Sequence, residues 1–224
     1  MKSFADNIIQ FYKTIQPPPK LPQGIEVLYP QKEKEVMVIV EQFYKKYYAD
    51  NNIRTLLFGI NPGRFGAGVT GINFTGPKQL KENCGIDHSL KMHSELSAEF
   101  IYEAIEKYGG VKKFYSHFFI SAISPLGYIK EGVNLNYYDD KMLQEAVTPY
   151  VVDCINKQLK WNINREKCIC VGGEKNYKFF SKLNEKQQWF KEIIPLPHPR
   201  FILQYRRKTK EIYLSQYLAA FSEI

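Results

Sequence analysis

The sequence predicts a single α/β domain in which a parallel β-sheet is covered by helices on both faces. Short, almost continuously apolar segments alternate with amphipathic helical segments along the chain. Such alternation is typical of parallel strands joined by right-handed helical crossovers. The 224 residues suffice for one sizeable core, and no repeat, low-complexity tract or composition shift divides them.

The first fifty residues of the 1–224 domain are predicted to form a helical cover for the sheet. Apolar residues recur at helical spacing over Ser3–Thr14 and again over Val36–Tyr47. The run Pro17-Pro18-Pro19 is expected to end the first helix, because proline lacks the amide hydrogen that a helix interior requires.

The rest of the chain alternates between strands and helices. Short apolar runs, as expected of strands covered on both faces, predict strands over Arg54–Ile60, Phe118–Ile123, Cys168–Val171 and Ile193–Leu196. Helical spacing predicts helices over Met92–Tyr108, Tyr138–Lys160, Lys175–Leu183 and Thr209–Phe221. Gly109-Gly110 should end the first of these helices, and Pro149 should kink or break the second.

Each predicted strand ends in residues with distinctive chemistry. The strand ends are Asn61-Pro62-Gly63, Ser124-Pro125, Gly172-Gly173 and His198-Pro199-Arg200. In open α/β sheets, ligands bind at the carboxyl ends of the strands. The sequence therefore places a candidate site at this edge of the sheet.

The charge balance favours a polyanionic partner. The chain has 31 Lys and Arg residues against 23 Asp and Glu, a formal net charge of +8 and an isoelectric point of about 9.1. Basic side chains that neutralise phosphates dominate affinity for nucleic acids. The alternative is that the charge only keeps a soluble protein away from its isoelectric point.

The cysteine pattern indicates neither disulfides nor a metal centre. Cys84, Cys154, Cys168 and Cys170 form no CxxC pair, and no histidine stands at zinc spacing from them. We therefore expect reduced thiols in a cytoplasmic protein. The N-terminal residues do not resemble a secretory signal, and no run of about 18 apolar residues predicts a membrane span.

Three short motifs follow the predicted strands. GINPG follows the first buried strand, TGINF closes the glycine-rich loop after it, and HPR follows the last strand. Together they resemble the motifs of the uracil-DNA glycosylase superfamily, most closely those of its single-strand-selective monofunctional branch. The resemblance extends from about Arg54 to Arg200.

The resemblance implies a three-layer α/β/α sandwich with a four-stranded parallel sheet. It also implies a monomeric enzyme of base excision repair that hydrolyses the N-glycosidic bond of uracil in single- or double-stranded DNA, without metal or cofactor. Such an enzyme takes the flipped base into a tight pocket. No lysine occupies a motif as a Schiff-base nucleophile, so the enzyme should be monofunctional.

By resemblance, Asn61 and His198 are the catalytic residues. Asn61 would orient the attacking water, because an amide is not a strong base, and His198 would donate to the O2 atom of the departing uracil. HPR is two residues shorter than the HPSPR pattern of that branch, so an alternative alignment places Leu196 at the histidine position. The structural alternatives are a turn residue before Pro62 for Asn61 and a surface loop for His198.

The resemblance also supplies a substrate-binding set. Phe74 would stack on the base, and the amide of Asn134 would match the O4 and N3–H edge of uracil. Ile60, Gly63 and Gly71 complete the set, the glycines because bare backbone can approach a base closely. The alternatives are a core aromatic for Phe74 and a helix N-cap for Asn134.

Basic and aromatic residues after the last motif predict DNA contacts. Arg200 and Phe201 could fill the gap that a flipped base leaves in the helix. Arg206 and Arg207 could bind phosphates, although such a charge run is also typical of a solvated helix face.

Three other functions remain open beside uracil release. The short second motif favours a glycosylase for hypoxanthine or xanthine. A non-catalytic nucleic-acid-binding protein could have kept the pocket, although the presence of Asn61, Phe74 and Asn134 argues against it. A nucleotide-phosphate enzyme is disfavoured, since the glycine-rich loop lacks the lysine and Ser/Thr that hold phosphates and Mg²⁺.

Overall fold

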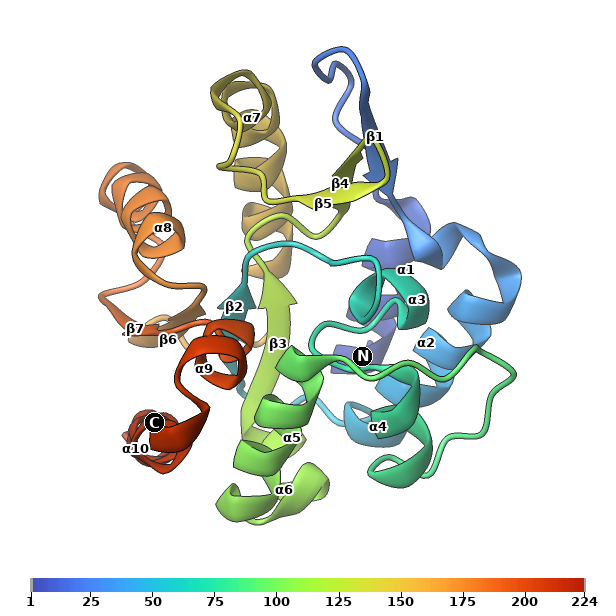
Figure 1. Cartoon of the computed structure of the whole chain (residues 1–224), viewed down its shortest axis with the longest axis vertical. Helices are drawn as coiled ribbons and strands as arrows, with labels where there is room; N and C mark the ends of the chain where they lie inside the picture. Colours follow the sequence, from blue (N-terminus) through green and yellow to red (C-terminus); the bar gives the residue numbers. More distant parts are fainter. Residues whose placement is uncertain (1, 224) are drawn as a thin grey trace.

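The computed structural model describes residues 2–223 and is built around a four-stranded parallel sheet with strand order β3-β2-β6-β7 (Figure 1). The strands are β2 (Thr55–Gly59), β3 (Phe118–Ala122), β6 (Lys167–Val171) and β7 (Glu192–Leu196). All residues of the central strand β2 and of β3 are buried, which explains their continuous apolar runs. The predicted fold class and all four predicted strands are confirmed.

Helices cover both faces of the sheet, so the domain has three layers. Adjacent residues of β3 point to opposite layers, as the strand period requires. The Phe118 ring lies 5.1 Å from that of Phe221, and the Phe119 ring lies 5.5 Å from that of Phe4. The helices are α1 (Phe4–Thr14), α2 (Lys34–Tyr47), α3 (Ala67–Thr70), α4 (Pro77–Glu82), α5 (Leu96–Tyr108), α6 (Gly110–His117), α7 (Lys141–Gln158), α8 (Glu174–Gln187), α9 (Pro199–Tyr205) and α10 (Lys210–Ser222), with short 3-10 helices at Pro30–Lys32 and Arg207–Thr209.

Several helix boundaries differ from the prediction. Helix α5 begins at Leu96 rather than Met92, because the Glu95 carboxylate caps it by accepting from the N–H groups of Ser97 and Ala98. Pro149 does not break α7, which runs uninterrupted through it. Helices α3, α4, α6 and α9 were not predicted.

A second, antiparallel sheet lies beside the main one and was also not predicted. It contains β1 (Ile25–Leu28), β4 (Gly127–Lys130) and β5 (Val133–Leu135) in the order β1-β4-β5. Strands β1 and β4 are about a hundred residues apart in the sequence, yet pair from Ile25–Lys130 to Leu28–Gly127. This sheet brings β5 to the carboxyl end of β2.

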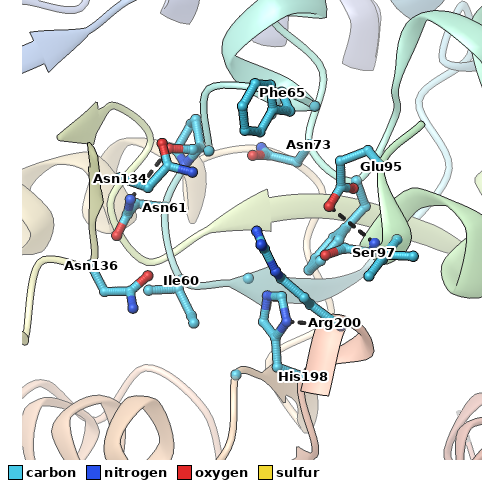
Figure 2. A pocket seen from close by; sticks show the side chains of 18 of the residues that line it. Ile60, Asn61, Phe65, Asn73, Glu95, Ser97, Asn134, Asn136, His198 and Arg200 are labelled. Carbon is cyan, nitrogen blue, oxygen red and sulfur yellow. Dashed lines mark hydrogen bonds between the residues drawn. The ribbon is translucent and has the colours of Figure 1, made fainter. Parts of the chain in front are cut away.

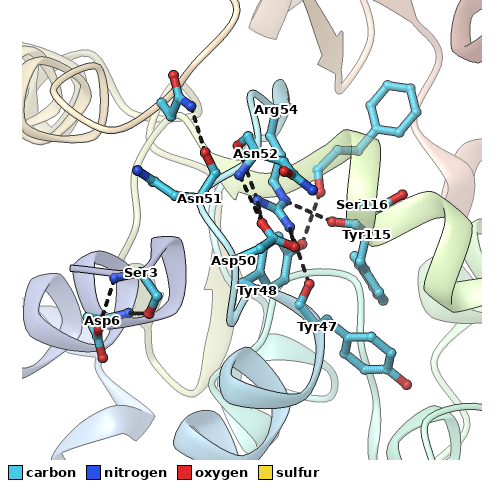
Figure 3. A network of polar contacts seen from close by, with 12 residues as sticks. Ser3, Asp6, Tyr47, Tyr48, Asp50, Asn51, Asn52, Arg54, Tyr115 and Ser116 are labelled. Atoms are coloured by element: carbon cyan, nitrogen blue, oxygen red, sulfur yellow. Dashed lines mark hydrogen bonds and ion pairs between the residues drawn. The ribbon is translucent and has the colours of Figure 1, made fainter. Parts of the chain in front are cut away.

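The N-terminal cover is fastened to the main sheet by Arg54, whose side chain is fully buried (Figure 3). Its guanidinium donates to both carboxylate oxygens of Asp50, at 2.8 and 3.1 Å, and to the backbone carbonyls of Tyr115, Tyr47 and Asn52. It also lies 4.8 Å from the Phe4 ring centroid and 4.7 Å from that of Tyr48. One buried cation thus joins α1, the end of α2 and the start of β2.

The Asp50 carboxylate is held in its charged form by this network. Burial acts to raise its pKa, but hydrogen bonds from Arg54 and from the backbone N–H of Asn52 outweigh that effect, so the pKa lies below its usual value. The Arg54 charge therefore keeps an ionised partner across the neutral pH range.

The four cysteines lie in the interior of the fold. Cys84, Cys154, Cys168 and Cys170 are buried free thiols, and burial raises the pKa of Cys154 and Cys170 to about 12. Within residues 2–223, every helix is too short or too polar to cross a bilayer.

Candidate active site

A pocket of about 510 Å³ lies at the carboxyl ends of the main-sheet strands (Figure 2). Residues from each strand end line it: Ile60 and Asn61 after β2, Ala122 at the end of β3, Gly172 after β6 and His198 after β7. The predicted convergence of strand ends is therefore present, and it brings together side chains that are far apart in the sequence. Phe74, Gly63, Asn134, Arg200 and Phe201 also line the pocket.

The amide of Asn61 is fixed on both sides. Its Oδ1 accepts the backbone N–H of Tyr137 at 3.1 Å, and its Nδ2 donates to the carbonyl of Leu135 at 3.2 Å. These bonds join the end of β2 to the segment after β5. A carbonyl oxygen has two lone pairs, so Oδ1 can still accept one hydrogen bond from a group in the pocket.

Phe74 is positioned as a half-buried ring against the end of β2. Gly59 leaves the space that the ring occupies, since a Cβ there would lie 2.9 Å from the Phe74 ring. Phe74 has a φ of +52°, which is uncommon for a bulky residue and indicates that the surrounding loop enforces its position. The ring centroids of Phe74 and His198 are 5.9 Å apart.

Asn134 lies at the rim of the pocket rather than in its interior. It is an exposed residue of β5, and its Oδ1 accepts the backbone N–H of Arg64 at 3.0 Å. It does not cap a helix, because Asp140 is the N-cap residue of α7. Its side-chain carbonyl is bound by the loop that follows Gly63, and its Nδ2 lies close to that glycine.

His198 is the N-cap residue of α9 and lines the pocket beside Arg200. Its Nδ1 accepts the backbone N–H of Arg200 at 3.2 Å. Burial, with a smaller contribution from the Arg200 charge, lowers the pKa of His198 to about 4, so the imidazole is neutral at pH 7. With Nδ1 as an acceptor, the remaining proton is on Nε2, which is then a donor.

The family is decided by comparison with known proteins. The model of the uracil DNA glycosylase superfamily matches residues 45–222, most of the chain. The chain belongs to the uracil-DNA glycosylase superfamily. It is also similar to wild-type SMUG2 of Pedobacter heparinus, whose crystal structure matches with a TM-score of 0.95 and 45% sequence identity over 100% of this chain and 98% of that one. A search of curated protein sequences found no match.

Membership in the superfamily makes this protein a DNA glycosylase, a hydrolase of the bond between base and sugar. The family resemblance inferred from GINPG, TGINF and HPR is therefore confirmed. Of the two alignments of the second motif, the structure places His198 in the pocket lining of the glycosylase, whereas Leu196 is a buried residue of β7 outside it.

Not all the predicted site residues of the glycosylase line the pocket. Gly71, expected to approach the base, lies behind the pocket, where a Cβ would meet Val40 at 2.8 Å and Val36 at 3.0 Å. Its φ of +73° and this close packing explain the glycine. Arg206 and Arg207 are exposed beyond α9 and also lie outside the pocket lining.

Aromatic rings and arginines stand at the pocket mouth. Phe65 and Phe201 are about two-fifths exposed and both line the pocket. The guanidinium of Arg64 lies 4.6 Å from the Phe65 ring centroid, and that of Arg206 lies 5.4 Å from the Phe201 centroid. Arg206 thus packs against the Phe201 ring at the pocket mouth, and the sequence analysis did not predict this contact.

Sequence reasoning missed several polar residues of the pocket, among them Asn73 and Glu95. Both carboxylate oxygens of Glu95 are occupied by the capping bonds at the start of α5. Asn73 is buried directly before Phe74 and was read only as part of the TGINF motif. The one available signal was the polar side chain within an otherwise apolar stretch.

Proposed function

We propose that this glycosylase releases uracil from DNA by monofunctional hydrolysis of the N-glycosidic bond, acting as a monomer in the cytoplasm. The observation that supports the proposal is the placement of Asn61, Phe74 and His198, from three separate segments, in one pocket. A base within a duplex is inaccessible, so the enzyme must take the flipped base into this pocket.

Phe74 provides the stacking surface for the flipped base. Stacking on an aromatic ring contributes roughly 1–3 kcal/mol per base and tolerates different bases. The backbone contact of the ring with Gly59 and the enforced φ of Phe74 fix the ring before the base arrives. Little conformational entropy of the Phe74 ring is therefore lost when the base binds.

Asn61 orients the attacking water through the lone pair of Oδ1 that Tyr137 leaves free. An amide does not remove a proton at neutral pH, so it contributes positioning rather than base catalysis. The bond to the base should then break early, with an oxocarbenium-like sugar that water attacks afterwards. The hydrolysis adds water across the glycosidic bond, giving free base and an abasic site.

His198 stabilises the negative charge that develops on the departing base. Its Nε2–H is held as a donor because Nδ1 accepts from Arg200, and it can reach the O2 atom of a base stacked on Phe74. A preorganised donor of this kind is worth about 3–4 kcal/mol in the transition state. Hydrolysis without a covalent intermediate agrees with the pocket lining, which includes no lysine among residues 2–223.

The lowered pKa of His198 predicts an unusual pH dependence. The rate of base release should show no titration near 6.5, the ordinary histidine pKa, and should fall only as the pH approaches about 4. Protonation there would place an N–H on Nδ1 against the N–H of Arg200, which displaces the ring. Single-turnover rates from about pH 3.5 to about pH 8, with circular dichroism as a folding control, measure this profile. An acid limb near 6.5 that disappears in His198→Gln would contradict the assignment.

The test of the proposed function is an excision assay on short oligonucleotides that contain uracil, hypoxanthine or xanthine, in single- and double-stranded form. Alkali cleavage after incubation reveals abasic sites. Release of uracil supports the proposal. Release of a purine lesion alone favours the second candidate, a glycosylase for deaminated purines. No release from any oligonucleotide refutes both.

A further inference from the structure

Asn73 is a buried polar residue at the pocket wall whose function is unexplained. Its side chain is 6% exposed, it lines the pocket, and it directly precedes the stacking residue Phe74. Figure 2 shows its amide pointing into the pocket. Burying an amide costs free energy unless its donor and acceptor atoms form hydrogen bonds. The hydrogen-bond partners of Asn73 therefore indicate its role.

The loop that holds Asn73 is rigidly built. Thr70 Oγ1 donates to the carbonyl of Thr75 at 2.6 Å, and Thr75 Oγ1 lies 3.2 Å from the carbonyl of Asn73, to which it donates. Gln31 Nε2 in addition donates to the carbonyl of Gly71 at 2.8 Å. The backbone at Asn73 is thus held from within the loop and from the N-terminal cover.

The N-terminal cover also fixes which end of the amide faces the pocket. Nδ2 of Asn73 donates to the hydroxyl of Tyr12, a residue of α1, at 3.4 Å. Burial raises the pKa of Tyr12 to about 12, so the hydroxyl stays neutral at pH 7. Within residues 2–223, no group donates to Oδ1 of Asn73, which leaves this oxygen as an acceptor for a ligand.

Two other amides that line the pocket, those of Asn134 and Asn61, already have hydrogen-bond partners. Asn134 is exposed at the rim, where its Oδ1 accepts the N–H of Arg64, and the proposed mechanism assigns the remaining Oδ1 lone pair of Asn61 to the attacking water. The end of β3 contributes only the methyl group of Ala122. Of the residues among 2–223 that bring a side-chain amide to the pocket, Asn73 alone is buried, and it directly precedes the stacking ring of Phe74.

We propose that Asn73 reads the flipped base, with Oδ1 accepting the ring N–H that lies beside a carbonyl in deaminated bases. Uracil has this N–H at N3, and hypoxanthine and xanthine have it at N1. Cytosine and adenine have a bare ring nitrogen there, whose lone pair would face Oδ1 and leave both groups unpaired. Guanine shares the N–H, so this contact does not exclude it. The inference rests on the proposed function and names the substrate class of the same pocket.

The test compares Asn73→Leu with Asn136→Leu, a matched change at another amide that lines the pocket. Asn73→Leu should lower single-turnover release of uracil roughly 10- to 100-fold, and Asn136→Leu much less. Asn73→Asp keeps an acceptor oxygen and should retain most of the activity. Tyr12→Phe frees the amide to turn and should give an intermediate loss.

A binding measurement separates this inference from the proposed function. Affinity is measured for an oligonucleotide with a non-hydrolysable uridine analogue and for one with an abasic analogue. Asn73→Leu should weaken the first roughly tenfold or more and leave the second unchanged. Equal effects of Asn73→Leu and Asn136→Leu in both assays would overturn the role of Asn73, as would a parent enzyme that binds both oligonucleotides equally. A parent enzyme that discriminates in binding yet releases no base would refute the proposed function alone.

Discussion

Asn61→Ala is expected to lower the rate of base release by about 100-fold or more while leaving the affinity for DNA nearly unchanged. The reason is that the Asn61 carbonyl holds the attacking water but is not expected to contact the phosphate backbone. Single-turnover release of uracil and the affinity for an oligonucleotide with an abasic analogue measure the two effects separately.

The control for this variant must account for a structural role of the same amide. Asn61 also joins the end of β2 to Leu135 and Tyr137, so its loss could displace that segment. Asn61→Asp keeps oxygen acceptors toward Tyr137 and the water but loses the donor to Leu135. It should retain more activity than Asn61→Ala. Release at the parent rate by Asn61→Ala would show that the water is oriented elsewhere, and equal losses in both variants with equal losses of stability would indicate a purely structural role.

Asp50→Ala is expected to lower the free energy of unfolding by about 3 kcal/mol, because it removes the ionised partner of a buried arginine. The substitution leaves the Arg54 guanidinium fully buried without its carboxylate, and arginine cannot lose its charge at any accessible pH. The remaining carbonyl partners and the rings of Phe4 and Tyr48 compensate only in part.

Urea unfolding of paired variants tests this prediction. Glu82→Ala removes an exposed partner of Lys78 at the same i,i+4 spacing, 3.8 Å apart, and should cost no more than about 0.5 kcal/mol. The double variant Arg54→Met with Asp50→Ala removes the buried charge itself and should be less destabilised than the sum of the single changes. A loss for Asp50→Ala no larger than that for Glu82→Ala would contradict the proposed importance of the buried cation.

The main sheet and the location of the site follow from local sequence patterns. Strands β2 and β3 are buried on both faces, so they appear in the sequence as continuous apolar runs whatever surrounds them. The motif after β2 and the histidine after β7 stand at strand ends, and parallel topology alone brings such ends to one edge. Asn61 and His198 could therefore be assigned to one pocket without a structure, whereas Phe74 was assigned to it by the family resemblance alone.

The antiparallel sheet was missed because its signal is not local. Strands β1, β4 and β5 have three or four residues each and are partly exposed, so their patterning is weak. Their stability comes from pairing between Ile25–Leu28 and Gly127–Lys130, distant in the chain. The consequence for the site is large, because β5 places Asn134 at the rim and not in the interior of the pocket.

By itself, the sequence determined the fold class, the superfamily and the strand ends that form the site, since hydrophobic period and turn chemistry are properties of neighbouring residues. Only the tertiary structure decided which polar atoms remain free in the pocket. The side-chain carbonyl of Asn73 faces the pocket because Tyr12, 61 positions earlier, accepts a hydrogen bond from the other end of the amide. The amide of Asn61 is likewise fixed by the backbone N–H of Tyr137, 76 positions later. The direction of a side-chain amide depends on such contacts between distant segments, and no local pattern specifies them.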